Sequence, residues 1–370
     1  MLELKANDST EIGSTVTTQN ETIRGESVLQ RLANYQPSGR SRLGRLTGVR
    51  IAATGSFLPQ RIVPNEELAN LGCDSQWIIQ RTGIAQRRYA DPDQATSDLA
   101  VEAARRCLEN ANVPASDVDL ILVATMTPDQ QTPSTACIVQ NKLGCLAPAV
   151  DMNAACAGFM YGLVTACQYI KSGCARNALV IGAEVMSRTV NPKDIKTYPL
   201  FGDGAGAVLV QASVDDDQGL VSYTLGSEGA GGSSLCIHAG GSREPLNADN
   251  LAAGRQYMVM DGRAVFKWAV RVVVDSTIDV LGAAGWYPQE LDGIFLHQAN
   301  LRIIDSAVED FGVDRDRLWI NLDRFGNTSA ASIPLALDEA NQQGKIKPGN
   351  KLLLSGFGSG LVWGTAALRW

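Results

Sequence analysis

The sequence predicts an α/β fold made of two related halves, and three observations support this prediction. Short apolar runs typical of strands alternate with helical patterns over most of the chain's 370 residues. The order of these segments in the second half repeats the order in the first. Finally, 45% of the residues are hydrophobic, which suffices for one large core or for two joined half-domains.

Residues 1–47 form a polar segment that is rich in Ser, Thr, Asn and Gln and has no sustained periodicity, so we predict a disordered extension. Acidic residues between Glu3 and Glu26 argue against an organelle transit peptide, and the missing hydrophobic stretch argues against secretion. A wrongly assigned start codon is another explanation for this segment.

The first predicted half covers residues 48–220 and begins with a strand that ends in glycine. Asn65 is placed to cap a short helix, and Gly173 is a typical stop signal for the helix that follows Cys156. The predicted elements are a strand at 49–55, short helical segments at 65–71 and 77–84, a helix at 97–110, strands at 120–124 and 147–150, a helix at 157–171, and strands at 178–182 and 208–211.

A glycine-rich turn at 201–207 leads into the last of these strands. Glycine-rich runs are weak evidence of nucleotide binding by themselves, and no helix follows this one, so we reject a dinucleotide site. The second predicted half covers residues 221–370. Its elements are a helix at 262–281, a strand at 293–296, a helix at 301–311, a strand at 318–322, a helix at 329–342 and a strand at 351–355.

The two halves match in spacing as well as in order. The strand at 121–125 aligns with residues 294–298 at an offset of 294 − 121 = 173. The same offset relates two further pairs, namely the strands at 178–182 and 351–355, and the residues Cys156 and Ser329. An internal duplication of two α/β halves is therefore the simplest interpretation.

Composition and charge exclude several classes of protein. The net charge of −7 argues against nucleic acid as the main partner. The eight cysteines are scattered, without CxxC or Cys/His metal spacing, which fits a reducing cytoplasm better than a disulfide framework and predicts no metal site. Because no run of about 18 apolar residues occurs, we predict no membrane span.

Cys156 lies where a strand is expected to end and a helix to begin, between small residues that leave room for a substrate. The free N–H groups and the positive end of the helix dipole at such a position stabilise a thiolate. The alternative is a buried structural cysteine, which is the commoner role of an arbitrary cysteine.

Two distant residues favour the catalytic interpretation. His297 follows an apolar strand, and Asn327 precedes the helix that matches the one after Cys156. Open α/β sheets bind ligands at the carboxyl ends of their strands, so these three side chains are expected at one edge. A thiol, a histidine and an amide there suggest acyl transfer through a thioester. Taken alone, His297 could be a strand-end residue and Asn327 an ordinary helix cap.

From about residue 48 to Trp370 the chain resembles β-ketoacyl-acyl carrier protein synthase III, a condensing enzyme of the thiolase fold. Five motifs carry the resemblance in order: NAACAGF (153–159), FGDGAG (201–206), HQANLRI (297–303), NTSAAS (327–332) and GFGSG followed by WG (356–364). The resemblance implies a five-layered α-β-α-β-α core built from the two halves.

The resemblance also implies a two-step reaction without a cofactor, in which the primer acyl-CoA is a substrate. Cys156 takes the acyl group from the primer, malonyl-acyl carrier protein then loses CO2, and the resulting carbanion attacks the acyl group. The residues matching His297 and Asn327 donate hydrogen bonds to the malonyl thioester oxygen. Backbone N–H groups of Cys156 and Ser359 form the other oxyanion hole, although most relatives have Gly or Ala where Ser359 stands.

Several binding residues follow from the resemblance alone. Trp77 and Arg81 match the positions that sandwich the adenine of CoA, Arg188 matches another CoA contact, and Asn300 matches a residue that either lies on the pantetheine side or orders the site. For Trp77 a role in the core is an equal alternative. Thr132 stands where several relatives have a phenylalanine that gates the acyl channel, which predicts a roomier primer pocket that the partner of a homodimer could help to form.

Arg263, Lys267 and Arg271 recur at spacings of four residues and form a basic stripe on one helix face. A solvated face is the default interpretation, but such a stripe on an acidic protein also suits an acidic carrier protein, and Arg302 could extend it. Because some relatives have Asn as a CoA contact at the position of Arg263, its role toward CoA is open.

Several alternatives compete with this interpretation. Two-histidine elongating enzymes are disfavoured because Asn327 occupies the place of the second histidine, and biosynthetic thiolases because the last cysteine is Cys236. Chalcone-type synthases share the Cys, His and Asn residues, but the sequences of the HQANLRI and GFGSG motifs favour synthase III. A specialised condensing enzyme for long chains or secondary metabolites remains an alternative, as does a non-catalytic scaffold that binds carrier protein.

Overall fold

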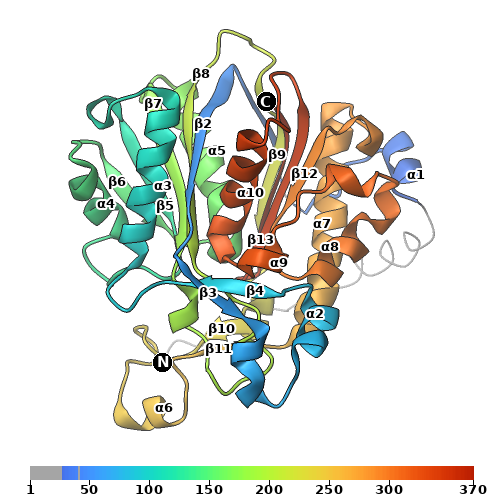
Figure 1. Ribbon diagram of the computed structural model, residues 1–370. Helices are drawn as coiled ribbons and strands as arrows, with labels where there is room; N and C mark the ends of the chain where they lie inside the picture. The colour runs from blue at the N-terminus through green and yellow to red at the C-terminus, as the bar shows by residue number, and fades with distance from the viewer. Residues whose placement is uncertain (1–26, 41) are drawn as a thin grey trace, which may run out of the picture.

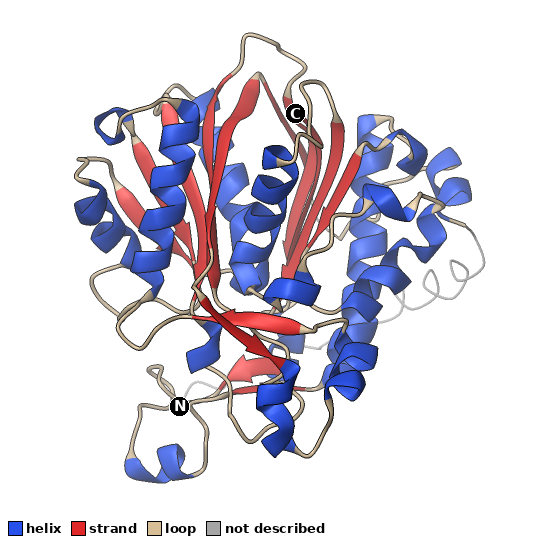
Figure 2. Cartoon of the chain, in the orientation of Figure 1, coloured by secondary structure: helices blue, strands red, loops and turns tan. Residues whose placement is uncertain are grey.

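The computed structural model describes residues 27–40 and 42–370, whose helices and strands form five layers (Figures 1 and 2). Two five-stranded sheets enclose one layer of helices, and each sheet carries further helices on its outer face. The predicted α-β-α-β-α arrangement of two α/β halves is therefore confirmed.

The first sheet has the strand order β2-β8-β7-β5-β6. Its strands are β2 (Val49–Phe57), β5 (Leu120–Ala124), β6 (Ala149–Met152), β7 (Asn177–Glu184) and β8 (Gly204–Ala212). Central β5 and β7 are almost entirely buried, as expected for parallel strands covered on both faces. Helices α3 (Thr96–Ala111) and α4 (Thr135–Leu143) cover the outer face.

The second sheet has the order β1-β9-β14-β13-β12. Its strands are β1 (Leu43–Thr47), β9 (Gly219–Ser227), β12 (Gly293–Leu296), β13 (Lys351–Gly358) and β14 (Val362–Arg369). Helices α7 (Gly262–Ala284) and α8 (Leu301–Val308) lie on its outer face. Helices α5 (Gly158–Lys171) and α10 (Ser332–Gln342) form the middle layer, where Phe159 and Leu163 of α5 share one apolar cluster with Ile333 and Leu337 of α10.

Smaller elements gather at one end of the molecule, at the bottom of Figure 1, or flank the second half. They are α1 (Val28–Ala33), the hairpin strands β3 (Arg61–Pro64) and β4 (Gln86–Tyr89), α2 (Ser75–Thr82), β10 (Leu235–Ile237), α6 (Ala248–Ala252), β11 (Met258–Met260) and α9 (Leu322–Phe325). The 3-10 helices are η2 (Asn65–Leu71), η3 (Ala115–Asp117), η4 (Ala155–Ala157), η5 (Met186–Arg188), η6 (Gly229–Ser234), η7 (Pro288–Glu290), η8 (Glu309–Phe311), η9 (Arg315–Arg317) and η10 (Ser329–Ala331).

The internal duplication is visible in the strand order, because β2-β8-β7-β5 of the first sheet corresponds to β9-β14-β13-β12 of the second. The counterpart of β6 is reduced to one parallel bridge between Ile294 and Leu318. The predicted strand at 318–322 is therefore wrong. The chain turns into α9 at Leu322 instead, and its polar residues, Asn321 and Asp323, do not extend an apolar strand.

The offset between the halves also needs a correction. It is 173 for β5 and β12, but β5 pairs Ile121 with Leu179 whereas β12 pairs Ile294 with Leu353, so β7 and β13 are related by 353 − 179 = 174. The turns η4 and η10 start at Ala155 and Ser329, which gives 174 again. Cys156 therefore corresponds to Ala330 and not to Ser329, because one residue is inserted between the strands.

The N-terminal prediction is wrong for part of its range. Residues 1–26 lie outside the described residues, but α1 and β1 fall within the segment 27–47 that we predicted to be disordered. Strand β1 pairs with β9, and α1 buries Val28 and Leu32 in the cluster that includes α7. Two apolar side chains one helical turn apart are enough to dock so short a helix, although they give too weak a pattern to predict it.

Candidate active site

Cys156 lies in η4, between the end of β6 and the start of α5, as predicted. The turn is tight: Ala155 has a left-handed φ of 43°, and its N–H donates to Asn153 Oδ1 at 3.2 Å. A non-glycine residue in this conformation is strained and is found mainly at functional sites. The strain positions the Cys156 thiol at the carboxyl end of the first sheet.

The matching turn of the second half has the same construction. Ser329 has a φ of 49°, and its N–H donates to Asn327 Oδ1 at 2.9 Å. Because Oδ1 is occupied, the amide nitrogen of Asn327 is the group left to face a ligand. The backbone of Asn327 is held by the glycine-rich turn: its N–H donates to Leu200 at 2.8 Å, and its carbonyl accepts from Gly202 at 3.0 Å. A side chain at Gly202 would collide with Phe325, so this glycine serves packing.

His297 follows β12 and is 1% exposed. Its Nδ1 lies 2.7 Å from the Ser332 hydroxyl oxygen, and its ring packs edge-on against Phe357 with centroids 5.2 Å apart. The Ser332 contact occupies one ring nitrogen, which leaves Nε2 for a ligand.

Ser359 follows β13, and its hydroxyl donates to the Leu235 carbonyl at 2.5 Å. Within the described part of the chain, neither its N–H nor that of Cys156 donates a hydrogen bond to another residue. Between them, Gly358 makes room for the thiol: an added Cβ would lie 2.8 Å from Cys156 Cβ and 3.2 Å from its Sγ. The two predicted oxyanion donors therefore flank the nucleophile.

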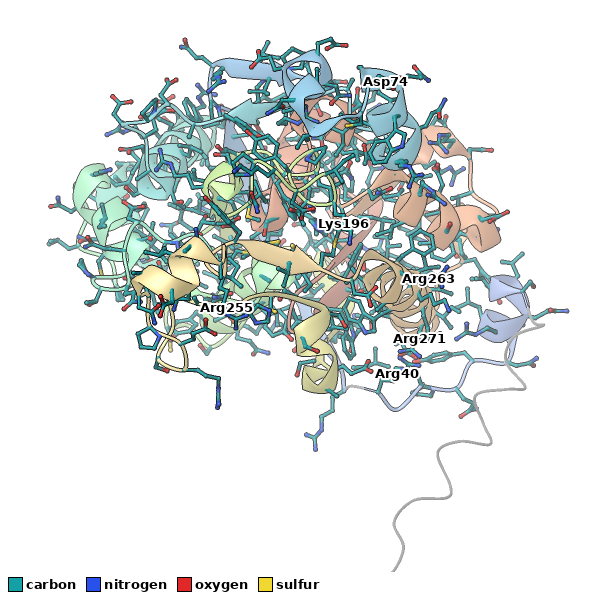
Figure 3. All side chains as sticks on the ribbon, turned by 90° about the horizontal axis from the view of Figure 1, so that it is seen from below. Arg40, Asp74, Lys196, Arg255, Arg263 and Arg271 are labelled. Atoms are coloured by element: carbon teal, nitrogen blue, oxygen red, sulfur yellow. The ribbon has the colours of Figure 1, made fainter. Side chains whose placement is uncertain are left out.

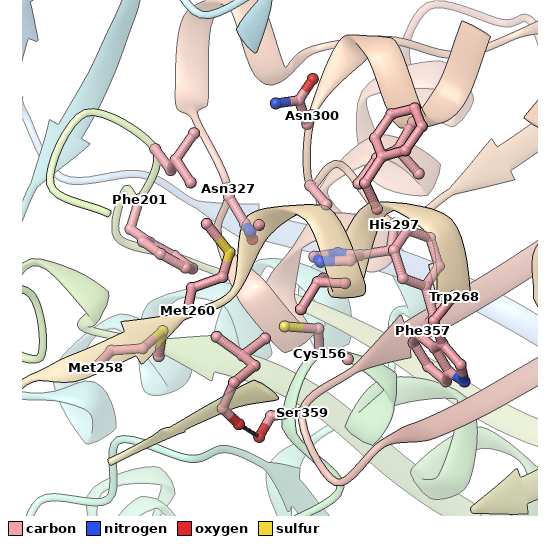
Figure 4. A pocket seen from close by; sticks show the side chains of 18 of the residues that line it. Cys156, Phe201, Met258, Met260, Trp268, His297, Asn300, Asn327, Phe357 and Ser359 are labelled. Carbon is pink, nitrogen blue, oxygen red and sulfur yellow. Dashed lines mark hydrogen bonds between the residues drawn. The ribbon is translucent and has the colours of Figure 1, made fainter. Parts of the chain in front are cut away.

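These residues share one apolar cavity of about 140 Å³ (Figure 4). The side chains of Cys156, His297 and Asn327 point toward a common space in the close view. The remaining lining is contributed by Met126, Leu200, Phe201, Leu235, Met258, Met260, Gly262, Val265, Phe266, Trp268, Ala299, Asn300, Ile303, Phe357, Gly358 and Ser359. The structure thus brings together three predicted residues that are up to 171 positions apart, since 327 − 156 = 171.

Burial controls the protonation of the reacting groups. It raises the pKa of the Cys156 thiol to about 12, although the Ser329 side chain acts in the opposite direction. We predicted a thiolate stabilised by the helix start, and this is not the resting state, because burial outweighs the favourable donors. Burial also lowers the pKa of His297 to about 3, so this histidine is neutral near pH 7.

The sequence interpretation missed Glu184, which ends β7 and is fully buried beside this site. Its carboxylate accepts a hydrogen bond from the Ser329 hydroxyl at 2.9 Å, and burial raises its pKa to about 7. A signal was available, because a carboxylate closing an otherwise apolar strand is unusual, but the predicted strand ended two residues earlier.

Two predicted CoA-binding residues lie on α2, outside the cavity. The Arg81 guanidinium lies 4.5 Å from the centroid of the half-buried Trp77 ring, so a base can enter between them only if Arg81 swings away. Asn300 joins this helix to the cavity: it caps α8, and its Nδ2 donates to the Arg81 carbonyl at 3.1 Å.

Arg188 and Thr132 also lie outside the cavity. Arg188 donates three hydrogen bonds to the carbonyls of Asp91, Pro92 and Gln94, so in this structure it secures the loop before α3. Thr132 is exposed in the loop before α4. It therefore does not enlarge the cavity of its own chain.

The predicted basic stripe is exposed along α7, the helix whose Val265 and Phe266 line the cavity. Figure 3 shows Arg263 and Arg271 on the face seen from below. Arg271 pairs with Glu228 at 3.8 Å, which compensates part of its charge. Arg302 on α8 is exposed as well.

None of the helices in the described residues has the length and apolarity to cross a membrane. No group of three or more His, Cys, Asp or Glu side chains in residues 27–40 and 42–370 is arranged to hold a metal ion.

Comparison with known proteins identifies the family. The family model described as 3-oxoacyl-[acyl-carrier-protein (ACP)] synthase III matches residues 150–229, and the model of its C-terminal part matches residues 281–370. A β-ketoacyl-[acyl-carrier-protein] synthase III from Rhodopirellula baltica is 59% identical over 345 residues, which cover 89% of this chain and 100% of that protein.

Solved structures agree. The 3-oxoacyl-[acyl-carrier-protein] synthase III of Aquifex aeolicus is 40% identical with a TM-score of 0.80, covering 87% of this chain and 100% of that one. The priming β-ketosynthase of the R1128 polyketide biosynthetic pathway is 36% identical with a TM-score of 0.80, covering 89% and 98%. With both family models and a relative of 59% identity in agreement, this chain belongs to the β-ketoacyl-[acyl-carrier-protein] synthase III family, the acyltransferases that initiate fatty-acid synthesis by condensation.

Proposed function

We propose that Cys156 takes an acyl group from acyl-CoA and that the acyl-enzyme then condenses with malonyl-acyl carrier protein. The observation that carries this proposal is the convergence of Cys156, His297 and Asn327 on one apolar cavity, with the backbone N–H groups of Cys156 and Ser359 beside the sulfur. In the first step the thiol sulfur attacks the primer thioester and CoA leaves. The N–H groups of Cys156 and Ser359 stabilise the tetrahedral oxyanion.

In the second step, the malonyl group loses CO2 and its thioester oxygen gains negative charge. A neutral His297 and Asn327 serve this step as hydrogen-bond donors through Nε2 and Nδ2. The Ser332 hydroxyl then donates to His297 Nδ1, which fixes the tautomer that carries hydrogen on Nε2. Decarboxylation itself generates the carbanion, so the side chains named here need no cofactor for this chemistry.

The cavity supports a short primer. Its volume of about 140 Å³ is close to that of a protein cavity that holds one benzene molecule, which is room for a few carbon atoms. We therefore favour a starter enzyme for fatty acids that uses acetyl-CoA or a similar primer. The 36% identity to the R1128 priming β-ketosynthase keeps a starter enzyme of secondary metabolism as the second candidate.

We further propose that Trp77, Arg81 and Arg188 bind CoA outside the cavity and that Asn300 orders its pantetheine arm. Support comes from the bond between Asn300 and the Arg81 carbonyl, which links the cavity rim to α2. The exposed Arg263, Lys267, Arg271 and Arg302 dock the acidic carrier protein, because Arg263 and Lys267 lie among the cavity-lining residues of α7.

The proposed assembly is a homodimer in the cytoplasm. Strand β6 is an edge strand with exposed apolar residues beside it, which suits pairing with a second copy. In such a dimer the Thr132 loop of one protomer reaches the primer pocket of the other. All eight cysteines have free thiols, which fits a reducing compartment.

The test is intact-mass spectrometry after mixing with a panel of acyl-CoAs, beside a Cys156→Ala control. We expect a mass increase of one acetyl group that the control lacks. Acylation by long-chain CoAs alone would move the assignment to a specialised condensing enzyme. Wild-type protein that gains no acyl group from any CoA would overturn the acyl-enzyme proposal.

A further inference from the structure

The buried Glu184 is the largest polar feature beside the site that the mechanism above does not use. Its two carboxylate oxygens accept hydrogen bonds from backbone N–H groups of Met126 and Thr127 at 3.1–3.2 Å. They also accept from the hydroxyls of Thr125, Thr127 and Ser329 at 3.0, 2.5 and 2.9 Å. An oxygen pair that faces only donors is suited to the ionised form, and the protein has built this site to hold it.

Ser329 connects this carboxylate to the nucleophile. It is fully buried, its hydroxyl donates to Glu184 Oε1, and it lies in η10, which packs against the η4 turn that carries Cys156, where Ser329 lowers the pKa of the thiol. A hydroxyl has one hydrogen, so while it donates to Glu184 it can only accept from the Cys156 S–H. When the sulfur is a thiolate, the same hydroxyl can turn and donate to it.

The duplication explains why a carboxylate is found here. Glu184 ends β7 and Gly358 ends β13, and the two are equivalent at the offset of 174, since 358 − 184 = 174. Each strand end touches the turn of the other half: Gly358 contacts Cys156 in η4, and Glu184 contacts Ser329 in η10. Gly358 has no side chain at this position and so leaves room for the reaction, whereas Glu184 places a carboxyl group at the equivalent position.

We propose that Ser329 passes the proton of Cys156 to Glu184 as the acyl group is transferred, and that Glu184 returns the proton when condensation releases the sulfur. This inference rests on the acyl-enzyme proposed above. Ser329 is the member of this pair that acts on the Cys156 thiol directly, whereas Glu184 acts through Ser329 and is a positioning and proton-holding residue.

Each step balances. In acylation, the S–C bond forms and the primer's C–S bond breaks, the thiol hydrogen moves to Ser329 Oγ, and the Ser329 hydrogen moves to Glu184 Oε1. CoA leaves as a thiolate and takes a proton from water. In condensation, the new C–C bond forms and the Cys156 C–S bond breaks. The thiolate regains hydrogen from Ser329, which regains hydrogen from Glu184, and the carboxylate is restored.

The charge states of the neighbours favour Glu184 over His297 as the acceptor. His297, with a pKa of about 3, holds a proton poorly, whereas burial raises the pKa of Glu184 to about 7, near the pH at which a base works best. The segment after β5 presents hydroxyl and N–H groups to Glu184, η10 presents the Ser329 hydroxyl, and η4 presents the Cys156 thiol, whose pKa the Glu184 charge raises. Transfer to Glu184 is therefore coupled to S–C bond formation, because the free thiol alone is the weaker acid.

The experiment compares Glu184→Gln and Ser329→Ala with the wild-type protein, using rapid-quench intact-mass spectrometry with acetyl-CoA between pH 5.5 and 9. We expect acylation about 100-fold slower at pH 7 in both variants, the usual size of a general-base contribution. The wild-type rate should rise with pH through about 7, and this rise should be absent from both variants. Decarboxylation of malonyl-acyl carrier protein should be equal in Cys156→Ala and in the Cys156→Ala, Glu184→Gln double variant, because that step needs no thiol proton.

Asp338→Asn is the matched control. Asp338 of α10 is also fully buried, but it accepts hydrogen bonds from the hydroxyls of Thr54 and Ser56 on β2 and makes no hydrogen bond to Glu184 or Ser329 within the described residues. Acylation within about threefold of wild type in Glu184→Gln and Ser329→Ala would overturn the relay, as would an equal loss in Asp338→Asn or a matching loss of decarboxylation. Should Glu184→Gln fail to fold, Ser329→Ala decides alone. Wild-type protein that is never acylated would instead overturn the proposed function.

Discussion

At the scale of single residues, burial shapes the chemistry more than any local charge does. Both Cys156 and His297 are driven to their neutral forms, the first by a raised pKa and the second by a lowered one. A neutral histidine is a good hydrogen-bond donor for a developing enolate but a poor base for a thiol. In the mechanism proposed here, the two tasks fall to different residues, with His297 as donor and Glu184 as proton acceptor.

Gly358 is the residue whose small size the site needs most. We expect Gly358→Ala to abolish acylation and to lower the stability of the fold, because the new methyl group would lie 2.8 Å from both the Cβ and the backbone nitrogen of Cys156 and would occupy the path to the sulfur. Alkylation of Cys156 by iodoacetamide, followed by mass spectrometry, checks the access to the thiol. Gly241→Ala is the control, since an added Cβ there meets nothing within 4 Å. Equal alkylation rates in wild type and Gly358→Ala would contradict this account.

At the scale of elements, local patterns predicted the strands of the first sheet and most of the longer helices, but not strands β1, β9 and β14, helix α4 or the contacts between halves. The strands at 147–150 and 293–296 were recognisable from their apolar runs, and the positions of Cys156 and His297 followed from them. The predicted strand at 318–322 failed because one bridge to Ile294 replaces it. Glu184 was missed because its partner, Ser329, lies 145 residues away in the sequence, on the other half. A pattern in the local sequence does not indicate a contact over such a separation.

The segment 27–40 shows how elements outside the duplicated core contribute stability. It packs on the C-terminal half of α7, where Arg31 and Arg40 pair with Asp275 at 2.9 and 3.3 Å, and Ser38 donates to Asp279. The residues of α7 that line the cavity lie at the other end of this helix. The segment is therefore placed to stabilise the fold without touching the site.

Removal of residues 1–40 is expected to lower the melting temperature by about 5 °C, because burial of Val28 and Leu32 contributes on the order of 2 kcal/mol each before the entropy of ordering the segment is subtracted. Differential scanning fluorimetry measures this shift. The acylation rate at 25 °C should stay unchanged. A chain that begins at residue 27 keeps every contact described here and is the control. A truncated protein with the same melting temperature as the wild type would show that the segment contributes no stability.

At the scale of the whole molecule, the open edge of the first sheet is the feature that calls for a partner. Strand β6 pairs with β5 on one side, and beside it Leu146 is 97% and Val150 49% exposed (Figure 1). Large exposed apolar side chains beside an unpaired edge are avoided in monomers, because the edge can pair with another chain. In the second sheet, β1 pairs with β9 and forms one edge, so the two sheets differ in how their edges are built.

We expect the wild-type protein to sediment as a dimer and the double variant Leu146→Asp, Val150→Asp to sediment as a monomer, because two carboxylates on this edge oppose apolar pairing. Analytical ultracentrifugation at micromolar concentration measures the change. Leu246→Asp is the control, since Leu246 is similarly exposed, at 55%, but lies before α6. A wild-type monomer would contradict the proposed assembly.

The same variant tests whether the dimer completes the site. Thr132 is exposed in the loop before α4, the helix that packs beside β6, so pairing along this edge would carry Thr132 toward the partner's cavity. The monomeric variant should then discriminate less between acetyl-CoA and longer acyl-CoAs in the acylation assay, because one wall of the primer pocket is missing. Unchanged discrimination in a proven monomer would mean that each chain closes its own pocket, and Thr132 would lose its predicted role in primer selection.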